Sequence, residues 1–226
     1  MTLSITLVII IATSVISFIS FNNQVLMDRL IFYPPAVVHN KEYYRFFSCG
    51  LIHKDIPHLL FNMYALYLFG NGQRQLEGVE SIFGDIFGSK GKILYLLMYV
   101  VSLGVCLLPT FNKHKNDENY LSLGASGAVS AVIFSYIFLQ PSTPVGLIFI
   151  PLYIPGFLFG FIYLLVSWLL DRRGKGNINH SAHIWGALFG IAYTAAAFKV
   201  FSHYPAFENF IQSVKNLDLH HIISSE

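Results

Sequence analysis

Long apolar runs dominate the chain, and they lie apart from its charged residues. Five segments contain no Asp, Glu, Lys or Arg: residues 1–27, 56–73, 93–112, 119–170 and 176–198. A transmembrane helix needs about 20 mostly apolar residues, so each segment has room for one helix and the fourth has room for two. The pattern predicts an all-α membrane protein that spans the bilayer several times.

Capping and helix-breaking residues predict where the helices begin and end. Asp55 is a typical N-cap and Pro57 a typical first-turn residue, so they predict the start of the second helix. A proline-rich break at residues 141–144 separates the fourth helix from the fifth, in which Pro151 and Pro155 predict a bend. We therefore expect six transmembrane helices, at about residues 3–21, 57–71, 93–109, 126–140, 145–170 and 180–200.

The six helices are expected to form one membrane domain over residues 1–203, followed by a polar C-terminal tail over residues 204–226. The first apolar run has no basic leader and no cleavage pattern, which indicates a retained helix rather than a signal peptide. The connection at residues 22–56 is too polar to span a membrane and carries an aromatic cluster. It is therefore expected to lie in the membrane interface.

Composition narrows the class of protein further. The chain is 54% hydrophobic and only 12% charged, whereas a soluble domain carries about 25% charged residues. This composition excludes a disordered chain and is not typical of an ordinary soluble domain. The net charge is +2 and the basic residues are scattered, a pattern that does not indicate binding to nucleic acid.

The helix at residues 126–140 is short for a membrane span. A helix of about 15 residues reaches only part of the way across a bilayer. Irregular backbone at membrane depth is tolerated only where protein or a water-filled cavity covers it. The segment that precedes this helix therefore predicts a wet cavity with Ser126 at its floor.

A small-residue stripe on the last helix offers this serine a partner. Gly186 and Gly190 form a GxxxG pair, which lets another backbone approach closely, and the helix after Ser126 carries small residues from Gly127 onward. If these two faces pack, His183 comes within hydrogen-bond reach of Ser126. Alone, the serine is more typical of a helix cap; a base beside a hydroxyl is what nucleophilic catalysis requires.

The second helix adds His58 and Asn62, which lie on one face at i and i+4. Both side chains can donate hydrogen bonds into the same cavity, as an acyl-transfer site requires for its developing oxyanion. A polar pair that only holds the start of the helix is the alternative. The histidine spacings do not match a zinc motif and no carboxylate lies nearby in the spans, so we expect no metal and no cofactor.

Taken together, these motifs resemble those of the rhomboid intramembrane serine proteases. The resemblance comprises a GxSG segment that opens one helix, an AHxxGxxxG segment on the last helix and an HxxxN segment on an early one; the matching residues are Gly124, Ser126, Gly127, His183, Gly186, Gly190, His58 and Asn62. Tyr44 and Arg45 are similar to the Trp-Arg motif of the family's first loop, with Tyr in place of Trp. The resemblance extends over nearly the whole chain.

The resemblance implies a serine endopeptidase that cleaves single-span membrane proteins in or near their transmembrane segments. Ser126 would be the nucleophile and His183 the general base and then acid. The backbone N–H of Ser126, with His58 and Asn62, would stabilise the oxyanion. The fifth helix and the loop at residues 171–179 would gate entry from the lipid bilayer. A plasma or inner membrane location with both termini cytoplasmic is also implied.

Two features depart from the family pattern. Ser130 stands where some members carry an aromatic residue that stacks on the histidine, so His183 needs another neighbour, such as His180. With cytoplasmic termini, five Lys and Arg residues lie inside and nine outside, so the positive-inside rule gives the opposite orientation. We keep the family's orientation, because four of the nine outside residues lie in the long first loop, and charges in long loops contribute little to the positive-inside rule.

Two other functions stay open at this point. One is a catalytically silent relative that binds membrane clients without cutting them. The other is a small transporter or channel, which is expected to show repeat symmetry and polar residues along a pathway. The polar residues here cluster at one depth, which favours a protease or a client-binding protein over a transporter.

Overall fold

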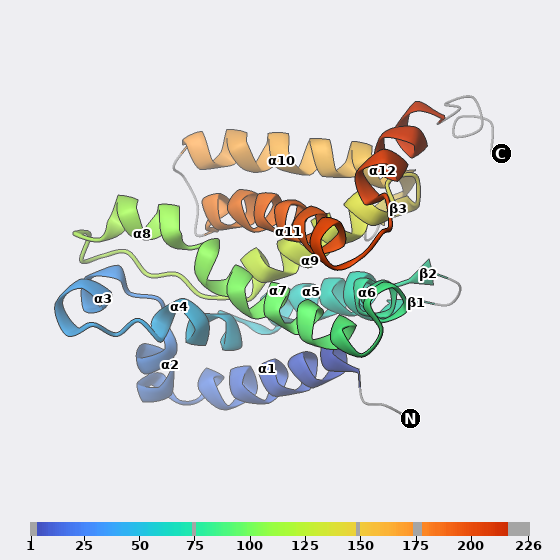
Figure 1. Ribbon diagram of the computed structural model, residues 1–226. Coiled ribbons are helices and arrows are strands. Elements are labelled where there is room, and N and C mark those ends of the chain that lie inside the picture. Colours follow the sequence, from blue (N-terminus) through green and yellow to red (C-terminus); the bar gives the residue numbers. More distant parts are fainter. Residues whose placement is uncertain (1–3, 74–75, 148–149, 174–177, 217–226) are drawn as a thin grey trace.

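The computed structural model describes residues 4–73, 76–147, 150–173 and 178–216. These residues form a helical bundle with two short β-hairpins (Figure 1). The α-helices are α1 (Ile5–Phe21), α2 (Gln24–Leu30), α3 (Pro34–Asn40), α4 (Arg45–Ser48), α5 (Ile56–Leu66), α6 (Val79–Phe87), α7 (Gly91–Val105), α8 (Leu108–His114), α9 (Ser126–Leu139), α10 (Gly156–Arg173), α11 (His180–Phe201) and α12 (Ala206–Lys215).

The longer helices run side by side along one direction, with α9 in the middle of the bundle (Figure 1). Helix α1 lies at one edge and α10 at the opposite edge. The short helices α2, α3 and α4 and helix α8 gather at one end, and α12 and the hairpins gather at the other. The connections at the two ends of the bundle are therefore separated by the length of the helices.

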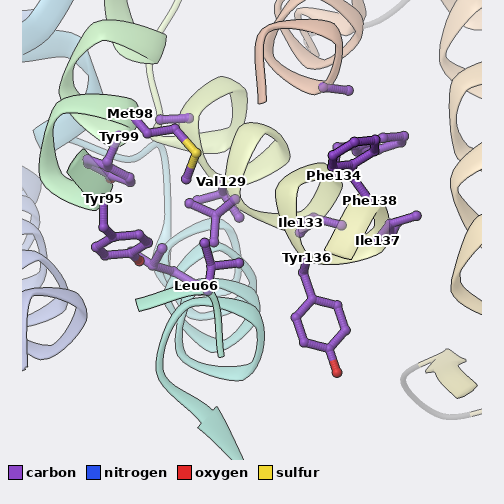
Figure 2. Packing of buried hydrophobic residues seen from close by; sticks show 14 of the residues in the cluster. Leu66, Tyr95, Met98, Tyr99, Val129, Ile133, Phe134, Tyr136, Ile137 and Phe138 are labelled. Atoms are coloured by element: carbon purple, nitrogen blue, oxygen red, sulfur yellow. The ribbon is translucent and has the colours of Figure 1, made fainter. Parts of the chain in front are cut away.

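Helix α9 is the core of the bundle. Every residue from 127 to 138 is buried, as expected for a helix that is apolar on all sides. Figure 2 shows its side chains between those of neighbouring helices, with Val129 facing Leu66 and Met98. Protein therefore surrounds α9 from residue 127 to residue 138.

Within the described residues, two helical segments are long and apolar enough to cross a membrane by length and composition, Val79–His114 and α11. Helices α1 and α9 are apolar but shorter. At 1.5 Å per residue, the 14 residues of α9 extend about 21 Å, less than the ~30 Å of a hydrocarbon core. The helical fold agrees with the prediction, whereas the number of six spans stays a prediction.

The start of α1 is fixed to α6 by a buried carboxylate. Glu80 accepts hydrogen bonds from the backbone N–H groups of Ile5 (2.7 Å) and Thr6 (2.8 Å), and from the hydroxyl of Ser4 (2.7 Å). The two backbone donors are unpaired N–H groups of a helix N-terminus, which favours negative charge. The contact holds α1 against the bundle at the end far from α8.

The predicted helix at residues 145–170 is wrong in its first part. Strands β3 (Pro144–Leu147) and β4 (Ile150–Pro155) form an antiparallel hairpin there, and α10 begins only at Gly156. Proline has no N–H and clashes with the preceding helical turn. Pro151 and Pro155, four residues apart, therefore exclude this segment from the helix instead of bending it.

Other boundaries also differ from the prediction. The predicted helix at 57–71 consists of α5 and a π-helical turn, Tyr67–Asn71, and the helix predicted at 93–109 is the middle of a longer helical segment. The predicted polar tail contains α12, whose Phe210 stacks on Phe138 of α9. Residue 3, part of the predicted gating loop (174–177) and the tail from 217 lie outside the described residues.

Candidate active site

Ser126 is the first residue of α9 and directly follows a turn that contains Gly124. Gly124 has a φ of +113°, which L side chains rarely adopt, and its N–H donates to the carbonyl of Cys49 (2.9 Å). A Cβ at Gly124 would lie only 2.7 Å from Cε1 of His58. Position 124 therefore needs glycine both for its backbone conformation and for the close approach of the His58 ring.

His183 lies in the first turn of α11, and Asn179 fixes the start of that helix. The Asn179 side-chain oxygen accepts from the N–H of Ala182 (3.0 Å) and from the hydroxyl of Thr110 (3.1 Å) on α8. The cap thus ties the start of α11 to a second element. An Asn before an apolar run is a typical N-cap, so the sequence carries a local signal for this cap, although Asn179 is not among the predicted site residues.

Helices α9 and α11 pack backbone against backbone. A Cβ at Gly186 would lie 2.0 Å from the carbonyl oxygen of Gly127, and one at Gly190 would lie 2.1 Å from that of Ala131. No side chain larger than hydrogen fits at either glycine. This approach brings Nε2 of His183 to 2.7 Å from Oγ of Ser126.

Ser126 and His183 line a cavity of about 680 Å³. Its lining includes His58, Asn62 and the apolar side chains of Leu103, Leu107 and Ile133, together with Ser126 and His183. The volume falls within the ordinary range of ligand pockets. The structure thus brings the two residues predicted for the dyad and the two predicted for the oxyanion site into one cavity.

The hydrogen bonds of α5 leave donors for this cavity. The N–H of Lys54 lies 3.5 Å from Nδ1 of His58 and donates to it, so in the neutral ring Nε2 carries the proton and is a donor. Asn62 donates one amide hydrogen to the carbonyl of His58 (2.9 Å), and its amide group has a second hydrogen. Each side chain therefore has one N–H for a ligand in the cavity.

Two rings flank the imidazole of His183. His180 meets it edge-on, with the ring centroids 5.8 Å apart, and Tyr163 of α10 lies nearly parallel to it, at 6.2 Å and an interplanar angle of 25°. His180 was predicted as a neighbour of His183 from the sequence, whereas Tyr163 was not. The sequence alone does not indicate that Tyr163 contacts His183, because this contact depends on how α10 packs against α9 and α11.

The first-loop pair lies outside the cavity lining. Arg45 is buried and donates from Nη1 to the carbonyls of Asp28 (2.8 Å) and Ile31 (2.7 Å), whereas Tyr44 is exposed. Arg45 also bonds Glu42, and this hydrogen bond holds the pKa of Glu42 below its ordinary value. The ion pair therefore contributes stability above the ordinary carboxylate pKa and loses it as pH falls through the lowered one.

A buried histidine that the sequence analysis did not single out supports the turn before Ser126. His53 is fully buried, and its Nε2 accepts from the N–H of Ala125 (3.4 Å). Nδ1 therefore carries the proton and donates to the hydroxyl of Ser17 (2.9 Å), which donates to the carbonyl of Leu51 (3.0 Å). The chain of hydrogen bonds links α1 to the residue preceding the candidate nucleophile.

We predict that His53→Ala lowers the free energy of unfolding by about 2–4 kcal/mol, because it leaves the Ala125 N–H unpaired and opens a cavity. Denaturant or thermal unfolding in detergent micelles measures the change. His39→Ala is the control: His39 is exposed, and such a change is expected to stay within about 0.5 kcal/mol. Equal stability of the two variants would contradict the supporting role.

Comparison with known proteins agrees with the motifs. The family model of the Rhomboid domain matches residues 40–200. RHOMBOID-like protein 12, mitochondrial, of Arabidopsis thaliana is 30% identical over 138 residues, covering 60% of this chain and 40% of that protein. Rhomboid-like protein 15 of the same plant is 26% identical over 195 residues, covering 82% of this chain and 44% of that protein.

A third relative comes from an animal. Presenilin-associated rhomboid-like protein A, mitochondrial, of Danio rerio is 28% identical over 144 residues, covering 62% of this chain and 34% of that protein. The chain spans less than half the length of each of these relatives. The match to the Rhomboid domain includes α5, α9 and α11, the helices that carry the cavity residues, and on this match the chain belongs to the rhomboid family of membrane proteins.

Proposed function

We propose that this protein is an intramembrane serine endopeptidase with Ser126 and His183 as its catalytic dyad. The observation that carries the proposal is the 2.7 Å contact between Nε2 of His183 and Oγ of Ser126 at the wall of the 680 Å³ cavity. A nucleophile and a base within hydrogen-bond reach are the signature of covalent catalysis. Membership of the rhomboid family supports the same activity.

In the first half of the reaction, Oγ of Ser126 attacks the scissile carbonyl carbon and its proton passes to Nε2 of His183. The tetrahedral intermediate collapses, the C–N bond breaks, and the protonated imidazole gives its proton to the leaving amine. Water then attacks the acyl-enzyme with His183 again as base, which releases the acid product and restores Ser126.

The negative oxygen of the intermediate needs donors that are already in place. The N–H of Ser126 is one of the unpaired groups at the start of α9. The Nε2–H of His58 and the second amide hydrogen of Asn62 complete a set of three in this proposal. The close contact of the His58 ring with Gly124 keeps that imidazole beside the turn that carries the nucleophile.

Single-span membrane proteins are the proposed substrates. The outward face of α10 is apolar, with Phe161, Leu165 and Trp168 exposed, which is the surface that a lipid-facing helix presents. A substrate helix that diffuses in the bilayer therefore meets this edge of the bundle. Water reaches the dyad separately, from the end of the bundle where Lys54, Ser122 and Asn179 line the cavity. The reaction needs no cofactor.

The test is a cleavage assay with purified protein in liposomes and a panel of single-span substrates. Wild-type protein is expected to cut at least one substrate in or beside its transmembrane segment, and Ser126→Ala is expected to cut none. A client-binding relative would retain substrate in a pull-down assay yet yield no fragments. Cleavage by purified Ser126→Ala protein would refute the proposed mechanism.

We also predict the topology: the cavity opens on the side of the membrane opposite both termini. Reporters at residue 226 and in the segment at residues 73–78, before α6, are expected to report one side, and a cysteine introduced as Lys54→Cys is expected to be labelled from the other. Detection of both reporters and the cysteine on one side would contradict this orientation.

The names of two relatives include a mitochondrial location, which favours a mitochondrial membrane over the plasma membrane.

A further inference from the structure

A tyrosine from a third helix connects the two helices of the dyad. Tyr163 lies on α10, whereas Ser126 is on α9 and His183 on α11. The Tyr163 ring lies nearly parallel to the imidazole of His183, at 6.2 Å and 25°, and its hydroxyl forms a 2.9 Å hydrogen bond with Oγ of Ser130. One side chain thus contacts the base and is fixed to the helix of the nucleophile.

The surroundings of Tyr163 hold its ring in place. Phe134 and Phe159 lie against it, with ring centroids 5.6 Å and 6.1 Å away. Gly160 lets α10 approach α9 closely, because a Cβ there would lie 3.2 Å from the ring of Phe134. Ser130 is buried, and a hydrogen bond shielded from water is stronger than an exposed one. The ring and its hydroxyl are therefore constrained from several directions.

The imidazole of His183 has few other restraints on its orientation. Its Nε2 bonds Ser126, and His180 meets the ring only edge-on at 5.8 Å. Nearly parallel aromatic rings with centroids 4.5–7 Å apart attract each other, so the Tyr163 face limits rotation of the imidazole about its own side-chain bonds. A third group that orients the base is a general requirement of nucleophile–base pairs.

We infer that Tyr163 is a positioning residue for His183, and that its hydrogen bond with Ser130 holds it in that role. The inference deepens the proposed proteolytic function and rests on it for its catalytic consequence. Because Tyr163 belongs to α10, the geometry of the dyad depends on the contact between α10 and α9.

The variants separate the ring from its hydroxyl. Tyr163→Leu removes the ring, Tyr163→Phe keeps it without the hydroxyl, and Ser130→Ala removes the partner of the hydroxyl. Tyr193→Leu is the matched control: this partly buried tyrosine of α11 donates to the carbonyl of Leu94 (2.9 Å) and lies outside the cavity lining. Unfolding temperatures of all four variants report the general structural cost.

The first measurement is the cleavage rate in liposomes with a single-span substrate. Misplacement of a catalytic group by about 1 Å can cost 10²-fold in rate, so Tyr163→Leu is expected to lower kcat by about 10–100-fold with KM nearly unchanged. Tyr163→Phe and Ser130→Ala are expected to lose less, and Tyr193→Leu to keep its kcat. Unchanged kcat in Tyr163→Leu, a rise in KM alone, or an equal loss in Tyr193→Leu would overturn the inference.

The second measurement does not depend on activity. With histidine labelled at Cε1, the NMR signal of His183 is assigned by its loss in His183→Ala. This signal is expected to shift and broaden in Tyr163→Leu, because the ring is gone and the imidazole samples several orientations, but to stay unchanged in Tyr193→Leu. An unchanged signal in Tyr163→Leu would overturn the inference. Inactive wild-type protein with the expected NMR change would refute the proposed function alone.

Discussion

Ser126→Ala or His183→Ala is expected to lower kcat for a single-span substrate by about 10⁴-fold or more. The two side chains act as one unit, because the serine hydroxyl is nearly unreactive at neutral pH without the base that lies 2.7 Å away. The double variant is therefore expected to be no slower than either single variant. Initial rates of fragment release in liposomes measure these losses.

The pH dependence of the wild-type rate provides a second check on the same prediction. His183 must be neutral to accept the serine proton, so activity is expected to fall as pH falls through the pKa of this imidazole. If the losses in kcat of Ser126→Ala and His183→Ala multiply in the double variant, this result would contradict a single catalytic unit. An activity that rises toward acidic pH would contradict a histidine base.

Asn62→Leu or His58→Ala is expected to lower kcat by about 10²–10³-fold, the usual cost of one oxyanion donor. Leucine has nearly the shape of asparagine but no N–H, so Asn62→Leu removes the donor and keeps most of the packing. KM is expected to change little, because the donors act on charge that develops in the transition state. Steady-state kinetics of the purified variants measure both constants.

The alternative for this pair is a purely structural role at the start of α5, where Asn62 bonds the carbonyl of His58. That role predicts a lower unfolding temperature and full activity in the molecules that stay folded. Unfolding curves recorded on the same samples separate the two outcomes. Normal kcat with impaired stability in both variants would contradict the oxyanion assignment.

The cavity residues could be anticipated because their signals are local and chemical. The GxxxG pair of Gly186 and Gly190 favours a partner helix with small residues, and the helix that begins at Ser126 carries such residues from Gly127 onward. The approach of Ser126 and His183 therefore follows from sequence spacing. The short α9 also predicted a cavity at Ser126, and Ser126 lines a cavity in the structure. Each inference needed only the period of one helix and the size of its residues.

The contacts made by α10 could not be anticipated in this way. Pro151 and Pro155 can bend or end a helix, and only the partner strand decides between these outcomes. Without the true start of α10, the direction of Tyr163 could not be derived. His53 was missed for a similar reason, since its partners, Ser17 and Ala125, are far away in the sequence. Long-range contacts between different elements are the information that residue spacing lacks.

Covalent labelling with a fluorophosphonate tests directly whether Ser126 is a nucleophile that His183 activates. Wild-type protein is expected to gain one adduct, which mass spectrometry locates at Ser126. Labelling is expected to vanish in Ser126→Ala and to fall almost as far in His183→Ala, while Tyr193→Leu labels at the wild-type rate. Labelling of Ser126 at an undiminished rate in His183→Ala, or an adduct only at another residue, would contradict the account.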